Sequence, residues 1–491
     1  MIDIPHIDWL TLGPTLALLA AAGVALLGSV LVPASISRGF AAYVTFAGFT
    51  ASGIVAGVVF YETGSPQELL AESMTRDRLG ALAAVILAGA GALSVLVSWG
   101  EQRRDHGGEY YALLAAAAAG MVFFVTASNL MTLFLGLEWF SIALYILCAL
   151  DTHRETSLEA GLKYLIVGSF GSALLLFGSA LVYGATGELG FAAIAQAGVE
   201  DELVLAGLAL VIAGLGFKAS AAPFHMWTPD VYQGAPTSVT AFMSAATKVA
   251  ALVLTLRVLT VAFPEQEDLW TVAIAVLAVA SLAVGNFAAL VQRDLKRLLA
   301  YSSVSHAGFM LIAIAANTEL GGRALLYYLI PYSAMSIGAF AVVAAREREL
   351  GVPATLDNLA GFGWERPFLG VAMWVFMLGF MGLPLTGGFV GKFYVFSAAY
   401  DAGWTWLVIV GVAATAISLY YYLGVVRAMY MRPDDLRAST EGRPVVVGGS
   451  PPRDPLLATA VAGALAVTVG SFFFVQPLID LARDAAASLP V

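Results

Sequence analysis

Seven ionisable side chains lie inside or beside long apolar runs, where a charge is costly. They are Glu138, Lys163, Lys218, His225, Lys248, His306 and Lys392. An ionisable group within a membrane helix costs about 2.5–3.5 kcal/mol on insertion scales, so by default it marks a functional site. Carboxylates, amines and imidazoles all bind and release protons. These residues therefore predict a path for protons through an apolar layer.

Glu138 and Lys218 are expected to form an exchangeable pair. Glu138 lies in Leu-Gly-Leu-Glu-Trp-Phe with no base nearby in the sequence, so its partner must come from another helix. Lys218 lies five residues before Pro223, beyond comfortable reach of either membrane face. A lysine beside a carboxylate keeps its charge, whereas a lysine left alone in an apolar site releases its proton. The pair predicts a proton switch. A static ion pair and a neutral, hydrogen-bonded glutamic acid are the structural alternatives.

Lys248 and Lys392 are the other two lysines expected at membrane depth. Lys248 lies in Ser-Ala-Ala-Thr-Lys-Val-Ala-Ala, where small neighbours leave room for water, and Lys392 follows Gly-Gly-Phe-Val-Gly. Neither lysine has a counter-charge close in sequence, and neither can easily reach a membrane surface. Both are therefore predicted to transfer protons.

Three residues are weaker candidates for the relay. Glu159 precedes Lys163 by four residues, a favourable helical spacing, so a local ion pair is an alternative role for Lys163. His225 follows Pro223-Phe224, and His306 lies among the hydroxyl groups of Tyr-Ser-Ser-Val-Ser-His. Imidazole titrates near neutrality, so either histidine could carry protons between lysines, and a structural histidine is the alternative.

The composition places these residues in membrane helices. Of the 491 residues, 60% are hydrophobic and only 12% are charged, which excludes a water-soluble surface. A net charge of -10 without a basic face argues against nucleic acid as a partner. The single cysteine, Cys148, excludes a cysteine-bound iron–sulfur cluster.

A bilayer core needs about 20 apolar residues per helix. On that basis the chain is an all-α polytopic membrane protein with about 14 transmembrane helices, at 9–32, 39–61, 79–99, 109–126, 129–150, 159–185, 202–222, 237–262, 269–291, 297–316, 323–345, 367–400, 403–430 and 454–481.

The basic residues indicate the orientation of the spans. Most arginines lie in connections that follow odd-numbered spans, such as Arg154, Arg293 and Arg348. The positive-inside rule places these connections in the cytoplasm of a prokaryotic cell and both termini on the outer face of its inner membrane. Lys296 and Arg297 are expected to be ordinary flanking charges of this kind.

Two sequence matches indicate an internal repeat. Residues 160–166 match 324–330, and Leu-Gly-Phe at 215–217 recurs at 378–380. The shared offset indicates two five-helix units, 109–262 and 263–430. An N-terminal three-helix segment, 1–108, precedes them, and a cytoplasmic loop with the last helix, 431–491, follows them. Because five is odd, the repeats are inverted. Each contains a broken helix, at Pro223 and at Pro384, and such breaks indicate an ion path. Asp230 is expected to anchor the first broken segment.

The segment from 222 to 237 contains Met-Trp-Thr-Pro-Asp-Val-Tyr-Gln-Gly, and Arg-Asp-Leu-Lys-Arg-Leu-Leu-Ala-Tyr-Ser-Ser-Val-Ser-His ends at 306. With these motifs the chain resembles the antiporter-like membrane subunits of respiratory complex I, the NADH-quinone oxidoreductase. The resemblance covers essentially the whole chain. It implies that Glu138, Lys218 and Lys248 transfer protons, that Lys163 modulates this transfer, that His225 and His306 relay protons, and that Lys392 faces the outer half-channel. A sister subunit has glutamate at the last position, so Lys392 favours the N branch.

The resemblance also implies partners and cofactors. The partners are other membrane subunits of complex I, including sister antiporter-like subunits, the lipid bilayer and a peripheral redox arm. NADH, FMN, iron–sulfur clusters and quinone belong to partner subunits, and no cofactor or metal is expected in this chain. The resulting hypothesis is a proton-translocating subunit that couples NADH oxidation by quinone to outward proton transport. The alternatives are a subunit of a multisubunit sodium/proton antiporter and a passive quinone-site scaffold.

Overall fold

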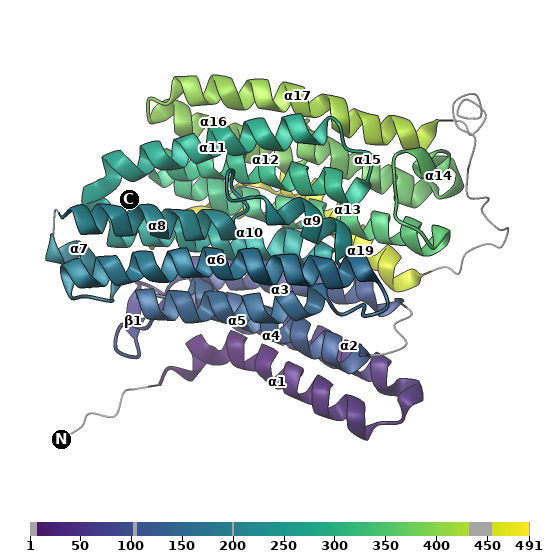
Figure 1. Cartoon of the computed structure of the whole chain (residues 1–491), viewed down its shortest axis with the longest axis horizontal. Coiled ribbons are helices and arrows are strands. Elements are labelled where there is room, and N and C mark those ends of the chain that lie inside the picture. The colour runs from purple at the N-terminus through teal and green to yellow at the C-terminus, as the bar shows by residue number, and fades with distance from the viewer. Residues whose placement is uncertain (1–6, 102–105, 199–200, 432–453, 491) are drawn as a thin grey trace.

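The computed structural model describes residues 7–101, 106–198, 201–431 and 454–490. Long helices lie side by side along the molecule (Figure 1). Twelve helices in the described ranges are long and apolar enough to cross a membrane. They are α1 (Trp9–Leu31), α2 (Ala34–Glu62), α3 (Arg78–Trp99), α4 (Gly107–Val125), α5 (Leu130–Cys148), α6 (Glu155–Thr186), α10 (Thr237–Ala262), α11 (Glu267–Ala289, preceded by a 3-10 turn, Pro264–Gln266), α12 (Leu295–Ala315), α13 (Glu319–Leu350), α17 (Thr405–Tyr430) and α19 (Pro455–Phe473).

The two remaining predicted spans are the two that were expected to be broken. The first consists of α8 (Glu202–Lys218) and α9 (Trp227–Gly234). The second consists of α15 (Pro367–Met381) and α16 (Gly387–Asp401). Twelve continuous helices and two interrupted segments in the described ranges are thus consistent with about fourteen spans.

Each break has a local cause in the backbone. After Lys218, the chain turns at Ser220, whose φ is 58°, and Pro223 has no backbone N–H to extend the helix. The amide of Ala222, freed by this turn, donates to the hydroxyl of Ser281 at 2.8 Å. After α15, Gly382 has a φ of 76°, and a Cβ there would lie 2.8 Å from the Lys392 side chain. Glycine is therefore required at 382.

The structure departs from the all-helical prediction in small ways. Residues between α2 and α3 form an antiparallel hairpin of β1 (Gln67–Leu69) and β2 (Met74–Arg76). The last predicted span, 454–481, ends earlier: α19 stops at Phe473, and a separate helix, α20 (Val475–Ala486), contacts α13 and α3. Short connecting elements are α7 (Phe191–Ala197), a 3-10 turn (Asp357–Leu359) and α14 (Phe362–Glu365).

The start of α1 and the end of the described chain lie at the same end of the helix bundle, at the left of Figure 1. Two ion pairs connect them to the hairpin region. Arg76 contacts Asp8 at 2.8 Å, and Arg78 contacts Asp484 at 3.6 Å. A chain that crosses the bundle an even number of times starts and finishes at the same end of it.

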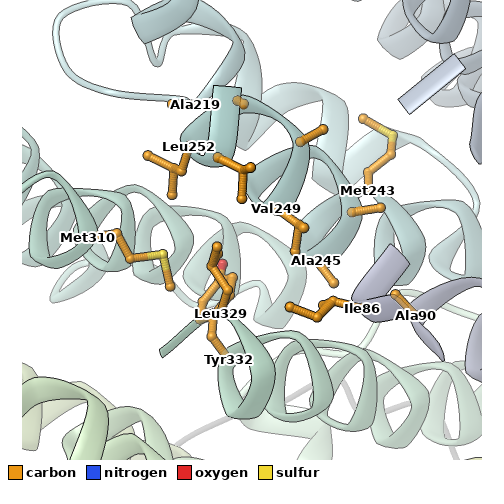
Figure 2. Packing of buried hydrophobic residues seen from close by; sticks show 14 of the residues in the cluster. Ile86, Ala90, Ala219, Met243, Ala245, Val249, Leu252, Met310, Leu329 and Tyr332 are labelled. Atoms are coloured by element: carbon orange, nitrogen blue, oxygen red, sulfur yellow. The ribbon is translucent and has the colours of Figure 1, made fainter. Parts of the chain in front are cut away.

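Helices α10, α12 and α13 form the centre of the bundle and are almost wholly buried. Met243, Ala245, Val249 and Leu252 of α10 project in several directions into apolar packing (Figure 2). Because α10 is enclosed on every side, a charged residue at its middle has no direct access to solvent or lipid.

Candidate functional site

Lys218 is the last residue of α8 and is 1% exposed. Its ammonium donates to the hydroxyl of Ser141 at 2.6 Å and lies 3.4 Å from that of Tyr164. The ring centroids of Phe140 and Tyr164 lie 4.8 and 5.2 Å away, close enough for cation–π attraction. The ammonium is also at the carbonyl end of α8, where the helix dipole favours positive charge.

Glu138 lies on α5, one helical turn before Ser141. Within the described part of the chain no ion pair joins Glu138 to Lys218, so the expected direct pair is not formed. One buried carboxylate oxygen, Oε1, has no hydrogen-bond partner among the described residues. Because Ser141 and Glu138 share one face of α5, Lys218 contacts the helix one turn away from the carboxylate.

Trp227 holds the first break beside Lys218. Its indole stacks on the Tyr164 ring at 4.4 Å with an interplanar angle of 7°. Its N–H donates to the carbonyl of Phe217 at 3.0 Å, so one side chain connects α6, α8 and α9. Any displacement of α9 therefore acts on the residues that surround the Lys218 ammonium.

Lys163, Asp230 and Arg297 join three helices through one carboxylate. The Lys163 ammonium contacts Asp230 at 2.8 Å and Glu159 at 2.8 Å. Arg297 contacts the other oxygen of Asp230 and also Gln233 at 3.2 Å. Asp230 thus anchors α9 to α6 and α12, as expected. Lys163 is 43% exposed and pairs locally, so its surroundings differ from those of the buried lysines.

Lys248 lies near the middle of α10 and is fully buried. Its ammonium has no hydrogen-bond partner among the described residues. It lies within electrostatic range of His225, in the segment between α8 and α9, and of His306 on α12. His225 is half-buried, and its Nδ1 likewise has no partner in the described ranges.

His306 is held by two tyrosines. Its Nδ1 is 2.8 Å from the hydroxyl of Tyr328 on α13, and its Nε2 is 3.0 Å from that of Tyr422 on α17. The Tyr422 hydroxyl also forms a short hydrogen bond with Ser302. A hydroxyl both donates and accepts, so the ring can exchange a proton at either nitrogen. The hydroxyl surroundings expected for His306 come mainly from tyrosines of other helices.

Lys392 is 4% exposed and lies across the second break. From α16 its ammonium donates to the carbonyl oxygens of Phe380 at 2.9 Å and Met381 at 3.3 Å, at the end of α15. It also lies 4.2 Å from the ring centroid of Phe309, which is one turn beyond His306 on α12. His306 and Lys392 are thus neighbours across one aromatic ring.

These contacts bring the predicted residues together in two groups. Lys218 lies at the first break, one turn of α5 from Glu138, and His306 and Lys392 lie at the second. Buried Lys248 is on α10, which packs against both α8 and α12. Sites of this kind, with ionisable groups buried at membrane depth and ordered by broken helices, are suited to moving protons.

Comparison with known proteins agrees with this architecture. Residues 127–418 match the family described as NADH:quinone oxidoreductase/Mrp antiporter, TM. NADH-quinone oxidoreductase subunit N of Trichlorobacter lovleyi is 42% identical over 426 residues, which are 85% of this chain and 87% of that protein. This chain belongs to the subunit N family of NADH-quinone oxidoreductases.

Solved structures share the same fold. A chain of respiratory complex I from Thermus thermophilus, solved with bound aureothin, is 34% identical, with a TM-score of 0.78; the match covers 96% of this chain and 99% of that one. A chain of the Mrp complex from a Dietzia species is 23% identical with a TM-score of 0.83, over 97% of both chains. The second likeness establishes a shared fold. A multi-pass membrane subunit of the subunit N family therefore accounts for the apolar helices and their two breaks.

Lys296 differs from its prediction as an ordinary flanking charge. Its side chain is 2% exposed, and its ammonium donates to the carbonyl of Ala235 at 3.0 Å. The ammonium also lies 4.0 Å from a carboxylate oxygen of Glu347 on α13. Both contacts come from segments far from Lys296 in the sequence, so its burial has no local signal.

Arg257 and Asp77 form a buried ion pair that the sequence analysis did not identify. Their side chains are 4% and 1% exposed, and both Asp77 oxygens accept from the guanidinium, one at 3.0 Å. Asp77 also accepts from the amide of Gly80 at the start of α3. The detectable signal was an arginine inside the predicted span 237–262, whereas its partner is 180 residues away.

Among the described residues, no group of three or more His, Cys, Asp and Glu side chains could hold a metal ion.

Proposed function

We propose that this chain moves protons outward across a bacterial inner membrane as part of an NADH:quinone oxidoreductase. The observation that carries the proposal is the placement of Lys218 and Lys392 at the two helix breaks, with fully buried Lys248 between them. The family and the relatives named for NADH-quinone oxidoreductase support the coupling to quinone reduction.

In this proposal the unit 109–262 receives protons from the cytoplasm and the unit 263–430 releases them outside. Both termini then lie on the outer face. Lys218 and Lys248 are loaded, His225 and His306 relay, and Lys392 releases. Glu138 and Lys163 set when Lys218 holds its proton. Each outward step works against about 2.3 kcal/mol per charge per 100 mV, so conformation or a neighbouring charge must change the proton affinity of the lysines.

The redox chemistry is assigned to partner subunits. NADH, FMN, iron–sulfur clusters and quinone would be bound in those subunits, and other membrane subunits would cover part of the exposed apolar surface. Candidate surfaces include Phe170 and Phe177 of α6 and Tyr420 of α17, which are 65%, 60% and 74% exposed. Partner helices or lipid would cover such side chains in the assembled complex.

Two substitutions of Lys218 test the proposal in the assembled complex. Lys218→Ala removes the ammonium, so quinone reductase turnover and proton pumping should fall together. Lys218→Arg keeps a positive charge near Ser141, but arginine does not release its proton, so it should fail equally. Assembly is checked on native gels. If assembled Lys218→Arg complex pumps at the normal rate, Lys218 is only a static charge and the proposal is wrong.

A sodium/proton antiporter remains the second candidate, because the matching family description includes Mrp antiporters. The two functions differ in their coupling. Pumping that requires quinone reduction and is unchanged without sodium supports the first function, whereas sodium-dependent proton exchange without NADH supports the second.

A further inference from the structure

A cleft of about 550 Å³ with several charged residues in its lining opens at the end of the bundle opposite Asp8 and Asp484. Its lining includes Glu101, Arg154, Thr237, Glu347 and Arg348. The arginines of this end are those that the positive-inside rule places in the cytoplasm. The cleft is therefore a recess lined by charged residues on the face from which protons are taken in under the proposed function.

The floor of the cleft is the beginning of α10. The Thr237 hydroxyl donates to the carboxylate of Glu347 in a short hydrogen bond, and Ser238 donates to Glu101 at 2.9 Å. The buried Lys296 ammonium lies 4.0 Å from the other carboxylate oxygen of Glu347. Glu347 is itself only 17% exposed. It thus connects the cleft to a hydroxyl of α10 and to a buried amine.

A stripe of hydroxyl side chains continues from Thr237 along α10. Thr240, Ser244 and Thr247 follow at intervals of three, four and three residues, and Lys248 comes next. This spacing keeps all of them on one face of a helix. At 1.5 Å per residue, Thr237 and Lys248 are separated by roughly 16 Å along the axis. The three residues between them, Thr240, Ser244 and Thr247, are fully buried.

Each hydroxyl of the stripe can support a chain of water. Thr240, Ser244 and Thr247 donate to backbone carbonyls, at 3.1, 2.9 and 2.6 Å. A donating hydroxyl keeps lone pairs that accept hydrogen bonds from water. At the inner end, Lys248 has three N–H donors and no partner among the described residues. The stripe therefore joins a charged cleft to an unpartnered buried amine.

We propose that Glu347 is the intake group for Lys248: it takes a proton from the cleft and passes it along the hydroxyl stripe of α10. The carboxylate gains a proton from water, and the proton is then transferred through hydroxyls and water to the neutral amine of Lys248. Only O–H and N–H bonds form and break, and no electron is transferred. Lys296 is a positioning residue that holds the carboxylate at the floor. The inference rests on the proposed function and adds an intake route for it.

A purely structural role for Glu347 is the competing explanation, because carboxylates stabilise the positive end of a helix dipole. A matched pair of variants at Thr237 separates the two roles. Thr237→Ser keeps the hydroxyl, whereas Thr237→Val keeps the shape and loses it. In the assembled complex, pumping should stay near normal in Thr237→Ser and fall roughly tenfold in Thr237→Val. Equal pumping in the two variants overturns the route.

Glu347 is tested in the same membranes. Glu347→Gln should lower pumping roughly tenfold, and Glu347→Asp should recover part of it because a titratable carboxylate returns. Asp357→Asn is the control, since that carboxylate lies at the same end of the bundle in an exposed pair with Arg293. Normal pumping in Glu347→Gln overturns the proposal. If Lys218→Ala lowers pumping while Glu347→Gln does not, only the route fails; if neither lowers it, the proposed function fails.

Access to the cleft is tested by thiol modification. Because Cys148 is the single cysteine and is buried, a Cys148→Ala background permits one new cysteine in this chain. A membrane-impermeant maleimide added from the cytoplasmic side should modify Val352→Cys, because Val352 lines the cleft and is 41% exposed, and the bulky adduct should then block pumping. It should modify Asp357→Cys without blocking it. Modified Val352→Cys complex that still pumps normally contradicts intake through the cleft.

Discussion

The ammonium of Lys392 lies 2.9 Å from the carbonyl oxygen of Phe380, across the break from its own helix. The internal sequence match aligns Phe380 with Phe217, the residue before Lys218. Each break therefore has a lysine at the end of its first helix: Lys218 is the last residue of α8, and Lys392 reaches the end of α15 from the other side of the break. A positive charge is favourable at that end of a helix. Each break thus provides a site that can hold a charged lysine inside the membrane.

This arrangement predicts that Lys392 contributes its proton as well as its hydrogen bonds. Lys392→Gln keeps N–H donors for the carbonyls of Phe380 and Met381 but removes the titratable amine. We expect the complex to assemble with this variant and to pump roughly tenfold more slowly. Dye-quench assays in membrane vesicles measure the pumping, and native gels measure assembly. Assembled Lys392→Gln complex with normal pumping would show that the lysine has only a structural role.

The sequence predicted the features that depend only on residues close to one another in the chain. Apolar runs of sufficient length defined the spans, and the segments around Pro223 and Pro384 marked the breaks. Lys218 and Lys248 were found because a charge inside an apolar run is visible without knowing its neighbours.

The features that the sequence did not predict depend on how distant segments pack. Lys218 contacts Ser141, one turn of α5 beyond Glu138 and 77 residues away from the lysine in the sequence. The buried ammonium of Lys296 contacts Ala235 and Glu347, which are 61 and 51 residues away in the sequence. The partners of His306, Tyr328 and Tyr422, come from helices 22 and 116 residues away. None of these relations follows from spacing within one helix.

Asp230 is predicted to affect turnover by positioning α9. Asp230→Asn removes the charge that holds both Lys163 and Arg297, so α9 and Trp227 should be held less firmly beside Tyr164. The pairs are partly exposed and each contributes about 0.2–1 kcal/mol. We therefore expect quinone reductase turnover to fall by up to about fivefold. Turnover of assembled complex at saturating NADH and quinone measures the effect.

Glu159→Gln is the matched control for Asp230→Asn. It removes the other carboxylate that contacts Lys163 and leaves the Asp230 contacts in place. Turnover should stay close to that of the unmodified chain. If Glu159→Gln lowers turnover as much as Asp230→Asn does, the charge on Lys163 matters and the anchoring of α9 does not.

Arg257 is predicted to stabilise the junction of α10 with α3, at the end of α10 that is remote from the cleft. Arg257→Met leaves the Asp77 carboxylate buried without its partner, which costs about 3–5 kcal/mol. The double variant Arg257→Met with Asp77→Asn removes both charges, and asparagine can still accept from the amide of Gly80. We expect the single variant to lower the thermal unfolding midpoint and the yield of assembled complex, and the double variant to recover most of both. A single variant as stable as the unmodified complex would mean that the pair does not hold this junction together.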